Sequence, residues 1–99
     1  MDYHNNIALV TELNSVKELC KEFENVSCFI GEALGKDEHD RWLYGKVTAS
    51  YNTKGNAKVT KILEQNGFDI SKVKVNDDEF RYGGYVMQTQ ATKTIKLEY

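Results

Sequence analysis

The sequence predicts an α+β fold, an antiparallel sheet of four to five strands with two helices packed on one face. Two observations carry this prediction. Apolar residues recur at helical spacing in two segments, and the segments between and after them alternate β-branched or aromatic residues with polar ones. The expected order of elements is α-β-β-α-β-β-β, in one domain spanning residues 1–99.

The first helix is predicted from an apolar stripe near the N-terminus. Spacings of four and three residues place its members on one side of a helix: Leu9, Leu13, Val16, Cys20 and Phe23. Ser15 and Glu18 form a capping-box pattern, which would start the helix late and leave residues 7–11 as a strand. We favour one helix from about Asn6 to Glu24, because the stripe continues upstream of Ser15.

A hairpin is expected after this helix, because the apolar period changes to two at Val26. The first strand is expected to run from Val26, and the second to span the aromatic-rich run 41–51. Between them lies the polar stretch 35–40, which suits a solvated hairpin tip.

A second, shorter helix follows the hairpin. Asn56 can cap its start, and Asn66-Gly67 can end it in the left-handed conformation. Its buried side is predicted from three apolar residues at helical spacing: Val59, Ile62 and Leu63.

The remainder reads as three strands, at 70–75, 80–90 and 92–99, with a Gly83-Gly84 pair inside the middle one. A faint echo relates the two halves, since Val16, Leu19 and Cys20 correspond to Val59, Ile62 and Leu63 at a shift of 43 residues. The offset changes to 40 and 38 further along the chain, so we favour chance over a duplicated αββ unit.

Composition indicates the cellular location of the protein and the distribution of its charge. No apolar run approaches the ~18 residues of a membrane helix, and the N-terminus lacks the pattern of a signal peptide. With only two cysteines, a disulfide framework is not expected, so we predict a cytoplasmic protein without a membrane partner. Residues 1–41 carry nine acids and four bases, whereas residues 42–99 carry six acids and nine bases, within a net charge of −2.

No catalytic set or cofactor motif is recognised. His39 stands among acidic and basic residues in the run 36–41, but a hairpin tip explains that run without chemistry. A zinc ligand set could be assembled from His4, Cys20, Cys28 and His39, yet their spacing does not match zinc modules. We therefore expect no enzyme, no cofactor and no metal.

The first hypothesis is a small acidic protein-binding module that acts by occupying a partner protein, such as a phage or mobile-element inhibitor of a host enzyme. Acidic turns and exposed aromatic and arginine side chains would make the contacts. The expected contact residues are Asp37, Glu38, Asp40, Tyr44, Asp77, Asp78, Glu79, Arg81, Tyr82 and Tyr85.

The alternative hypothesis is a nucleic-acid-binding domain. Lys54, Lys58 and Lys61 recur at helical spacing and could lie along a phosphate backbone, with strand aromatics stacking on bases. Either hypothesis is compatible with a monomer or a homodimer.

Overall fold

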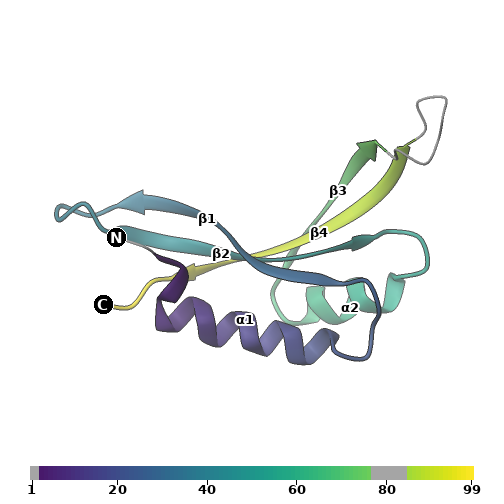
Figure 1. Cartoon of the computed structure of the whole chain (residues 1–99), viewed down its shortest axis with the longest axis horizontal. Helices are drawn as coiled ribbons and strands as arrows, with labels where there is room; N and C mark the ends of the chain where they lie inside the picture. Colours follow the sequence, from purple (N-terminus) through teal and green to yellow (C-terminus); the bar gives the residue numbers. More distant parts are fainter. Residues whose placement is uncertain (1–2, 77–84) are drawn as a thin grey trace.

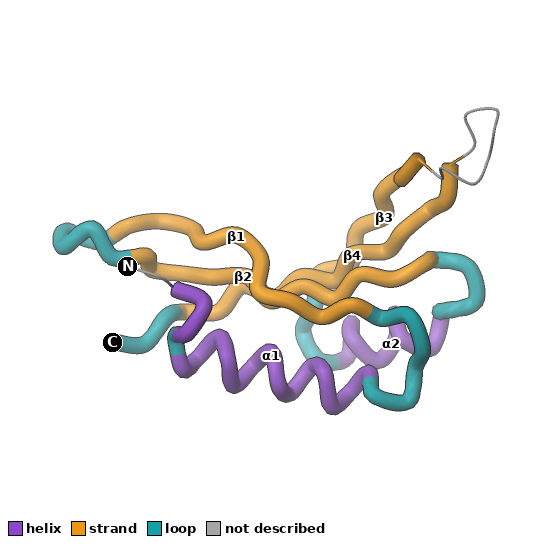
Figure 2. The backbone as a smooth tube through the Cα atoms, viewed as in Figure 1, coloured by secondary structure: helices purple, strands orange, loops and turns teal. Residues whose placement is uncertain are grey.

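The computed structural model describes residues 3–76 and 85–99. Figure 1 shows two helices lying beneath one face of an antiparallel sheet, and Figure 2 shows the same arrangement as a backbone tube. This confirms the α+β class. The elements are η1 (Tyr3–Asn5), α1 (Ile7–Cys20), β1 (Ser27–Lys36), β2 (Trp42–Asn52), α2 (Ala57–Gln65), β3 (Asp69–Asn76) and β4 (Tyr85–Lys96).

The sheet has the order β1-β2-β4-β3, so β1 and β3 are its edges. All three pairings are antiparallel. The β2–β4 pairing is regular and sets Ala49 opposite Ala91, whereas the β1–β2 register shifts between Ile30 and Ala33. The shift is a β-bulge, in which two residues of β1 oppose one residue of β2.

The two strands predicted at 80–90 and 92–99 are one strand. β4 runs without interruption from Tyr85 to Lys96, so the described chain has the order α-β-β-α-β-β. Ala91, where the sequence suggested a break, is fully buried opposite Ala49, and its small side chain lets a helix lie close to the sheet. The Gly83-Gly84 pair and the start of the 80–90 prediction lie outside the described residues.

Helix α1 begins where the favoured prediction placed it. Oδ1 of Asn6 accepts a hydrogen bond from the Ala8 amide at 3.1 Å and caps the helix. Ser15 is exposed in mid-helix, so the capping-box alternative is wrong. The helix ends at Cys20 rather than Glu24, because the chain turns back to the sheet through Asn25, whose φ is 64°.

The core lies between the helices and the covered face of the sheet. Leu9 and Val16 of α1 and Val59 and Leu63 of α2 are fully buried. They pack with the odd-numbered residues of β2, which are Val47, Ala49 and Tyr51. Burial of each large aliphatic side chain contributes about 1.5–3 kcal/mol. No described helix is long and apolar enough to cross a membrane.

Helix α2 is joined to the sheet by a half-buried pair of hydroxyl groups. The Tyr51 hydroxyl lies 2.7 Å from Oγ1 of Thr60, which joins β2 to the first turns of α2. At the other end Gly67 adopts a φ of 86°, and the Phe68 amide donates to the Leu63 carbonyl at 3.0 Å. This is the left-handed helix ending that the Asn66-Gly67 pair predicted.

Each half of the described chain is a helix followed by a hairpin. β2 and β4 lie at the centre of the sheet, and β1 and β3 lie at its edges. A twofold rotation that placed β2 on β4 would therefore also place β1 on β3. The corresponding helix positions share their burial, since Val16, Val59 and Leu63 are fully buried and Cys20 is 5% exposed. The arrangement thus repeats the αββ order that the faint sequence echo suggested.

Gly45 allows α1 to approach the sheet. A Cβ at this position would lie 2.6 Å from Cδ1 of Leu9, closer than non-bonded carbon atoms approach. We expect Gly45→Ala to lower the free energy of unfolding by about 1–3 kcal/mol, measured by urea denaturation. Leu9→Ala should cost about 2–5 kcal/mol.

The double variant Gly45→Ala/Leu9→Ala tests the cause. The smaller side chain at position 9 leaves room for the new methyl group. The double variant should therefore lose less free energy of unfolding than the sum of the two single losses. Strict additivity would show that Gly45 acts through its backbone rather than through Leu9. Gly31→Ala is the matched control, since the nearest atom to its Cβ would be Oγ1 of Thr48 at 3.2 Å, well beyond the 2.6 Å contact at Gly45.

Candidate interaction surface

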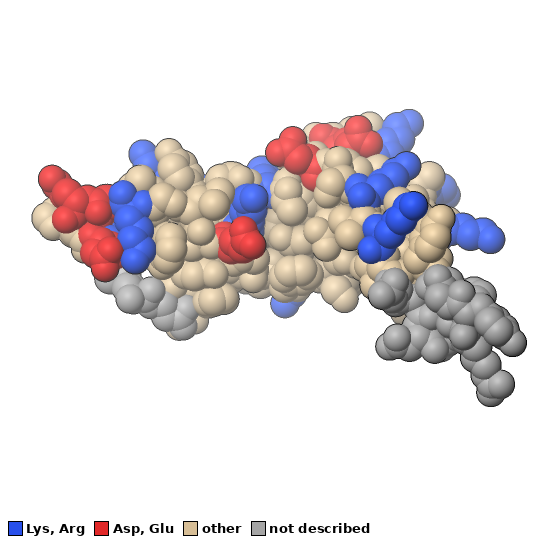
Figure 3. All heavy atoms as spheres, turned by 90° about the horizontal axis from the view of Figure 1, so that it is seen from above, with Lys and Arg blue, Asp and Glu red and all other residues tan. Residues whose placement is uncertain are grey.

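One face of the sheet is left uncovered by the described helices. Side chains alternate along a strand, so the even-numbered residues of β2 and their partners on β4 point away from the core. Figure 3 looks onto this side of the molecule. The residues at its centre are mostly uncharged and polar: Thr48 and Ser50 from β2, and Gln88, Gln90, Thr92 and Thr94 from β4.

Apolar side chains flank this polar centre on the β1 side. Phe29 lies opposite Thr48 and is 44% exposed. Leu34 lies opposite Tyr44, and these residues are 38% and 40% exposed, respectively. Leu34 reaches the same face as Phe29 because the bulge between Ile30 and Ala33 shifts the alternation by one residue. Phe29, Leu34 and Tyr44 together are called the apolar flank below.

A shallow hollow of about 270 Å³ lies between the apolar flank and the centre of the sheet. It combines one aromatic wall with a carboxylate, an ammonium group, hydroxyls and an amide. Its lining residues are Phe29, Gly31, Glu32, Lys46, Thr48, Gln90 and Thr92. A partner side chain that entered it would therefore meet both an apolar surface and hydrogen-bonding groups.

The hairpin tip between β1 and β2 is organised by Asp37. Its Oδ1 accepts hydrogen bonds from the amides of His39 and Arg41 at 2.8 and 2.9 Å, and its Oδ2 accepts one from Nε of Arg41 at 2.9 Å. The Arg41 amide is the largest cause that lowers the pKa of Asp37 below its ordinary value of 3.8. Asp37 thus holds the turn together from inside.

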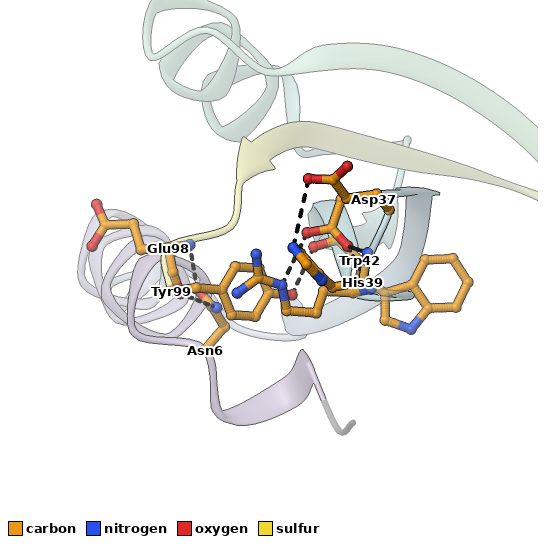
Figure 4. Close-up of polar contacts among 8 residues, drawn as sticks. Asn6, Asp37, His39, Trp42, Glu98 and Tyr99 are labelled. Carbon is orange, nitrogen blue, oxygen red and sulfur yellow. Dashed lines mark hydrogen bonds and ion pairs between the residues drawn. The ribbon is translucent and has the colours of Figure 1, made fainter.

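The C-terminal residues brace this tip against the start of α1. Asn6 donates to the carbonyl of Glu98 at 2.7 Å, and the Glu98 amide donates back to Asn6 at 3.2 Å. The Tyr99 hydroxyl donates to the carbonyl of Trp42 at 2.7 Å, while Arg41 lies over the Tyr99 ring. Figure 4 shows Tyr99 between these two parts of the chain. The tip is therefore held on both sides.

The remaining charged side chains of the tip point into solvent. Glu38 and Asp40 are 86% and 85% exposed in their side chains. Nζ of Lys36 lies 3.2 Å from Asp40, and Nε2 of His39 lies 3.5 Å from Glu38. Figure 3 shows acidic and basic side chains side by side at this end of the molecule. Of the three acids predicted here, Glu38 and Asp40 are the ones available to a partner.

Tyr85 lies at the far end of the sheet, away from the tip. It is 55% exposed, and Nζ of Lys74 lies 4.6 Å from the centre of its ring. Together with Lys54 it lines a second hollow, of about 460 Å³. The other contact residues predicted in this region lie outside the described residues: Asp77, Asp78, Glu79, Arg81 and Tyr82.

The three lysines of the nucleic-acid hypothesis do not share one helix. Lys54 precedes α2 in the turn after β2, whereas Lys58 and Lys61 are exposed on α2 itself. Because α2 packs beneath the sheet, Lys58 and Lys61 lie on the opposite side of the molecule from the uncovered face. The strand aromatics of the apolar flank and these lysines are therefore not brought together.

The two cysteines meet inside the covered face. Burial raises the pKa of Cys20 to about 11, with the neighbouring Cys28 thiol adding to the effect, and burial also raises the pKa of Cys28. Both are free thiols. Across residues 3–76 and 85–99, no three His, Cys, Asp or Glu residues lie close enough to hold a metal ion.

Comparisons with protein-family models, with curated proteins and with solved structures found no match.

Sequence reasoning missed most of the uncovered face. The signal for Phe29 was present, because it alternates with Cys28 and Ile30, which point to the core. Leu34 and the hollow depend on the bulge, for which the sequence carries no local mark other than Gly31. Gln90 and Thr92 can be placed beside the hollow only when the β2–β4 register is known, and that register is a long-range property.

Asp37→Asn should loosen the hairpin tip. The amide side chain accepts hydrogen bonds more weakly than a carboxylate and loses the charge facing Arg41. We expect faster hydrogen exchange at the His39 and Arg41 amides, measured by NMR, while Glu38→Gln, the matched control, leaves both unchanged.

The pH dependence follows from the lowered pKa of Asp37. Because its folded-state pKa is below the unfolded value of 3.8, its contribution to stability is present above that pH and is lost as the pH falls through the folded value. A carboxyl titration midpoint at or above 3.8 in the native protein would contradict the hydrogen-bonding scheme.

The thiols should react slowly in the native state. A pKa of about 11 leaves little thiolate at Cys20 near neutral pH. We expect alkylation by iodoacetamide at about pH 8 to be at least tenfold slower than in the denatured protein. In the Cys28→Ala variant Cys20 is the only cysteine, so mass spectrometry of this variant measures the alkylation rate of Cys20 itself. Equal native and denatured rates would show that the thiols are accessible.

Proposed function

We propose that this chain is a non-enzymatic protein-binding module that docks a partner protein on the uncovered face of its sheet. The observation that carries the proposal is the apolar flank, in which Phe29, Leu34 and Tyr44 are each more than one third exposed on a face that no described helix covers. Exposed aromatic and aliphatic side chains grouped in this way mark interaction surfaces.

The geometry of the face supports tight docking. Phe29 and Tyr44 stand on strands paired along most of their length, so their backbone is already ordered before a partner arrives. A surface that is preorganised loses less conformational entropy on binding. The hollow beside Phe29 offers a place for one anchoring side chain of the partner.

The charge of the face favours a protein over a nucleic acid. The polar centre of the face is uncharged, and the charged groups around it have both signs, with Lys46 and Lys96 balanced by Glu32 and Asp69. A phosphate backbone requires a track of positive charge, which this mixture does not provide. Hydroxyl and amide groups instead match the hydrogen-bonding groups of a protein surface.

Glu38 and Asp40 would act at the rim. Both extend into solvent beyond the apolar flank, on a turn that Asp37 and the C-terminal residues hold in place. Charges at the rim of an interface mainly increase the association rate and add little to the final affinity. We expect them to steer a partner that carries basic residues beside its docking surface.

The test compares two double serine variants, one on the uncovered face of the sheet and one on α2. A partner recovered on the wild-type chain and then purified should bind Phe29→Ser/Tyr44→Ser at least about tenfold more weakly, because the loss of two anchors typically costs more than 1 kcal/mol each. Binding is measured by titration calorimetry. The control Lys58→Ser/Lys61→Ser removes two exposed side chains of α2, beneath the sheet, and should bind as the wild type does.

The opposite result would overturn the proposal. If the lysine variant loses binding and the Phe29→Ser/Tyr44→Ser variant keeps it, the interaction uses α2 instead. If the recovered partner is nucleic acid and its affinity falls steeply with salt, the alternative hypothesis replaces this one.

A further inference from the structure

The outer edge of β3 lies apart from the uncovered face. Among the described strands, β3 pairs with β4 only. The Thr53 amide donates to the carbonyl of Met87, and the Leu97 amide donates to that of Leu43, so odd-numbered residues along β4 direct their backbone groups toward β2. Because this direction alternates along a strand, the even-numbered residues of β4 face β3.

The register then identifies the outward groups of β3. Val73 lies opposite Gln88 and Ser71 opposite Gln90, so these residues of β3 direct their backbone groups inward, to β4. The residues between them direct N–H and C=O outward: Ile70, Lys72 and Lys74. Within 3–76 and 85–99, no residue hydrogen-bonds to these outward groups.

The side chains along this edge divide into two rows. Lys72 and Lys74 are exposed on the side of the helices, and Lys72 has no ion-pair partner among the described side chains. Val73, which is 38% exposed, lies on the other side, toward the uncovered face. The edge therefore offers unpaired backbone groups, a positive row and an aliphatic row at once.

We propose that this edge accepts an extended acidic segment of a partner protein as an added strand. Strand addition satisfies the outward N–H and C=O groups, and alternate side chains of the segment supply the specificity. Acidic residues at every second position would lie beside Lys72 and Lys74, where opposite charges on neighbouring strands stabilise the pairing. The intervening side chains, β-branched or aliphatic, would pack beside Val73.

A second copy of the chain is a poor occupant of this edge. Two β3 strands that paired antiparallel about a twofold axis would keep their helices on the same side of the joined sheet. Lysine would then face lysine, and like charges directly opposite one another are destabilising. The same lysines that repel a second copy attract an acidic strand.

The probe is a short capped peptide that alternates glutamate with threonine, labelled with a fluorophore. We expect it to bind the full chain in a salt-dependent manner, measured by fluorescence anisotropy. Amide shifts in NMR spectra should be concentrated at Ile70, Lys72 and Lys74. The corresponding peptide that alternates lysine with threonine should bind about tenfold more weakly, because two cross-strand pairs change sign.

A charge exchange makes the test specific. Lys72→Glu/Lys74→Glu should reverse the preference, losing the glutamate peptide and gaining the lysine peptide by a similar factor. The control Lys58→Glu/Lys61→Glu carries the same change of net charge on α2 and should retain the wild-type preference. Both variants alter exposed residues, and far-UV circular dichroism verifies that they fold.

Four outcomes would overturn the inference. The first is that the glutamate peptide does not bind at all, which is the result expected if the edge lysines serve only to prevent indiscriminate strand pairing. An equal loss in the α2 control would show attraction by net charge alone. Binding of oligo-uridylate with shifts at the same amides would assign the lysines to nucleic acid, and a concentration-dependent dimer mass with shifts there would assign the edge to a second copy.

Discussion

The close approach of α1 to the centre of the sheet determines the rest of the molecule. Leu9 packs onto Gly45, and Ala49 and Ala91 lie opposite each other at the buried centre of the sheet. Small residues here let the helix bury its apolar stripe without separating from the strands. Once α1 lies against this face, the alternation of the strands decides which side chains are in the core and which remain outside.

The packing of α1 on one face determines which side chains lie on the other face. At the centre of the outer face of β2 and β4 the side chains are threonine, serine and glutamine, which can hydrogen-bond to water where no helix covers them. Three exposed apolar side chains of this face, Phe29, Leu34 and Tyr44, lie together beside the bulge and the hollow. The braces formed by Asp37, Asn6 and Tyr99 keep this end of the hairpin ordered. Order and exposure therefore coincide at the apolar flank.

The local features of the fold could be predicted from the sequence, whereas the surfaces could not. The stripe from Leu9 to Cys20 and the Asn66-Gly67 ending depend on neighbours a few residues away, and both were predicted correctly. The division of 80–99 into two strands was wrong, because Ala91 reads as a weak strand former until its partner Ala49 is known. The sheet order and the bulge are long-range properties, so the pairing of Leu34 with Tyr44 and the free edge of β3 appear only in three dimensions.

The same antiparallel sheet presents two unlike surfaces because face and edge expose different groups. A face offers side chains, and here they are apolar at the flank and neutral at the centre. An edge offers backbone groups, which every protein strand can satisfy, so discrimination there must come from charge. Lys72 and Lys74 meet that requirement, and they lie at the end of the molecule opposite the acidic tip. A partner that engaged both surfaces would gain affinity from their linkage without any new contact, provided that its own segments span the distance between them.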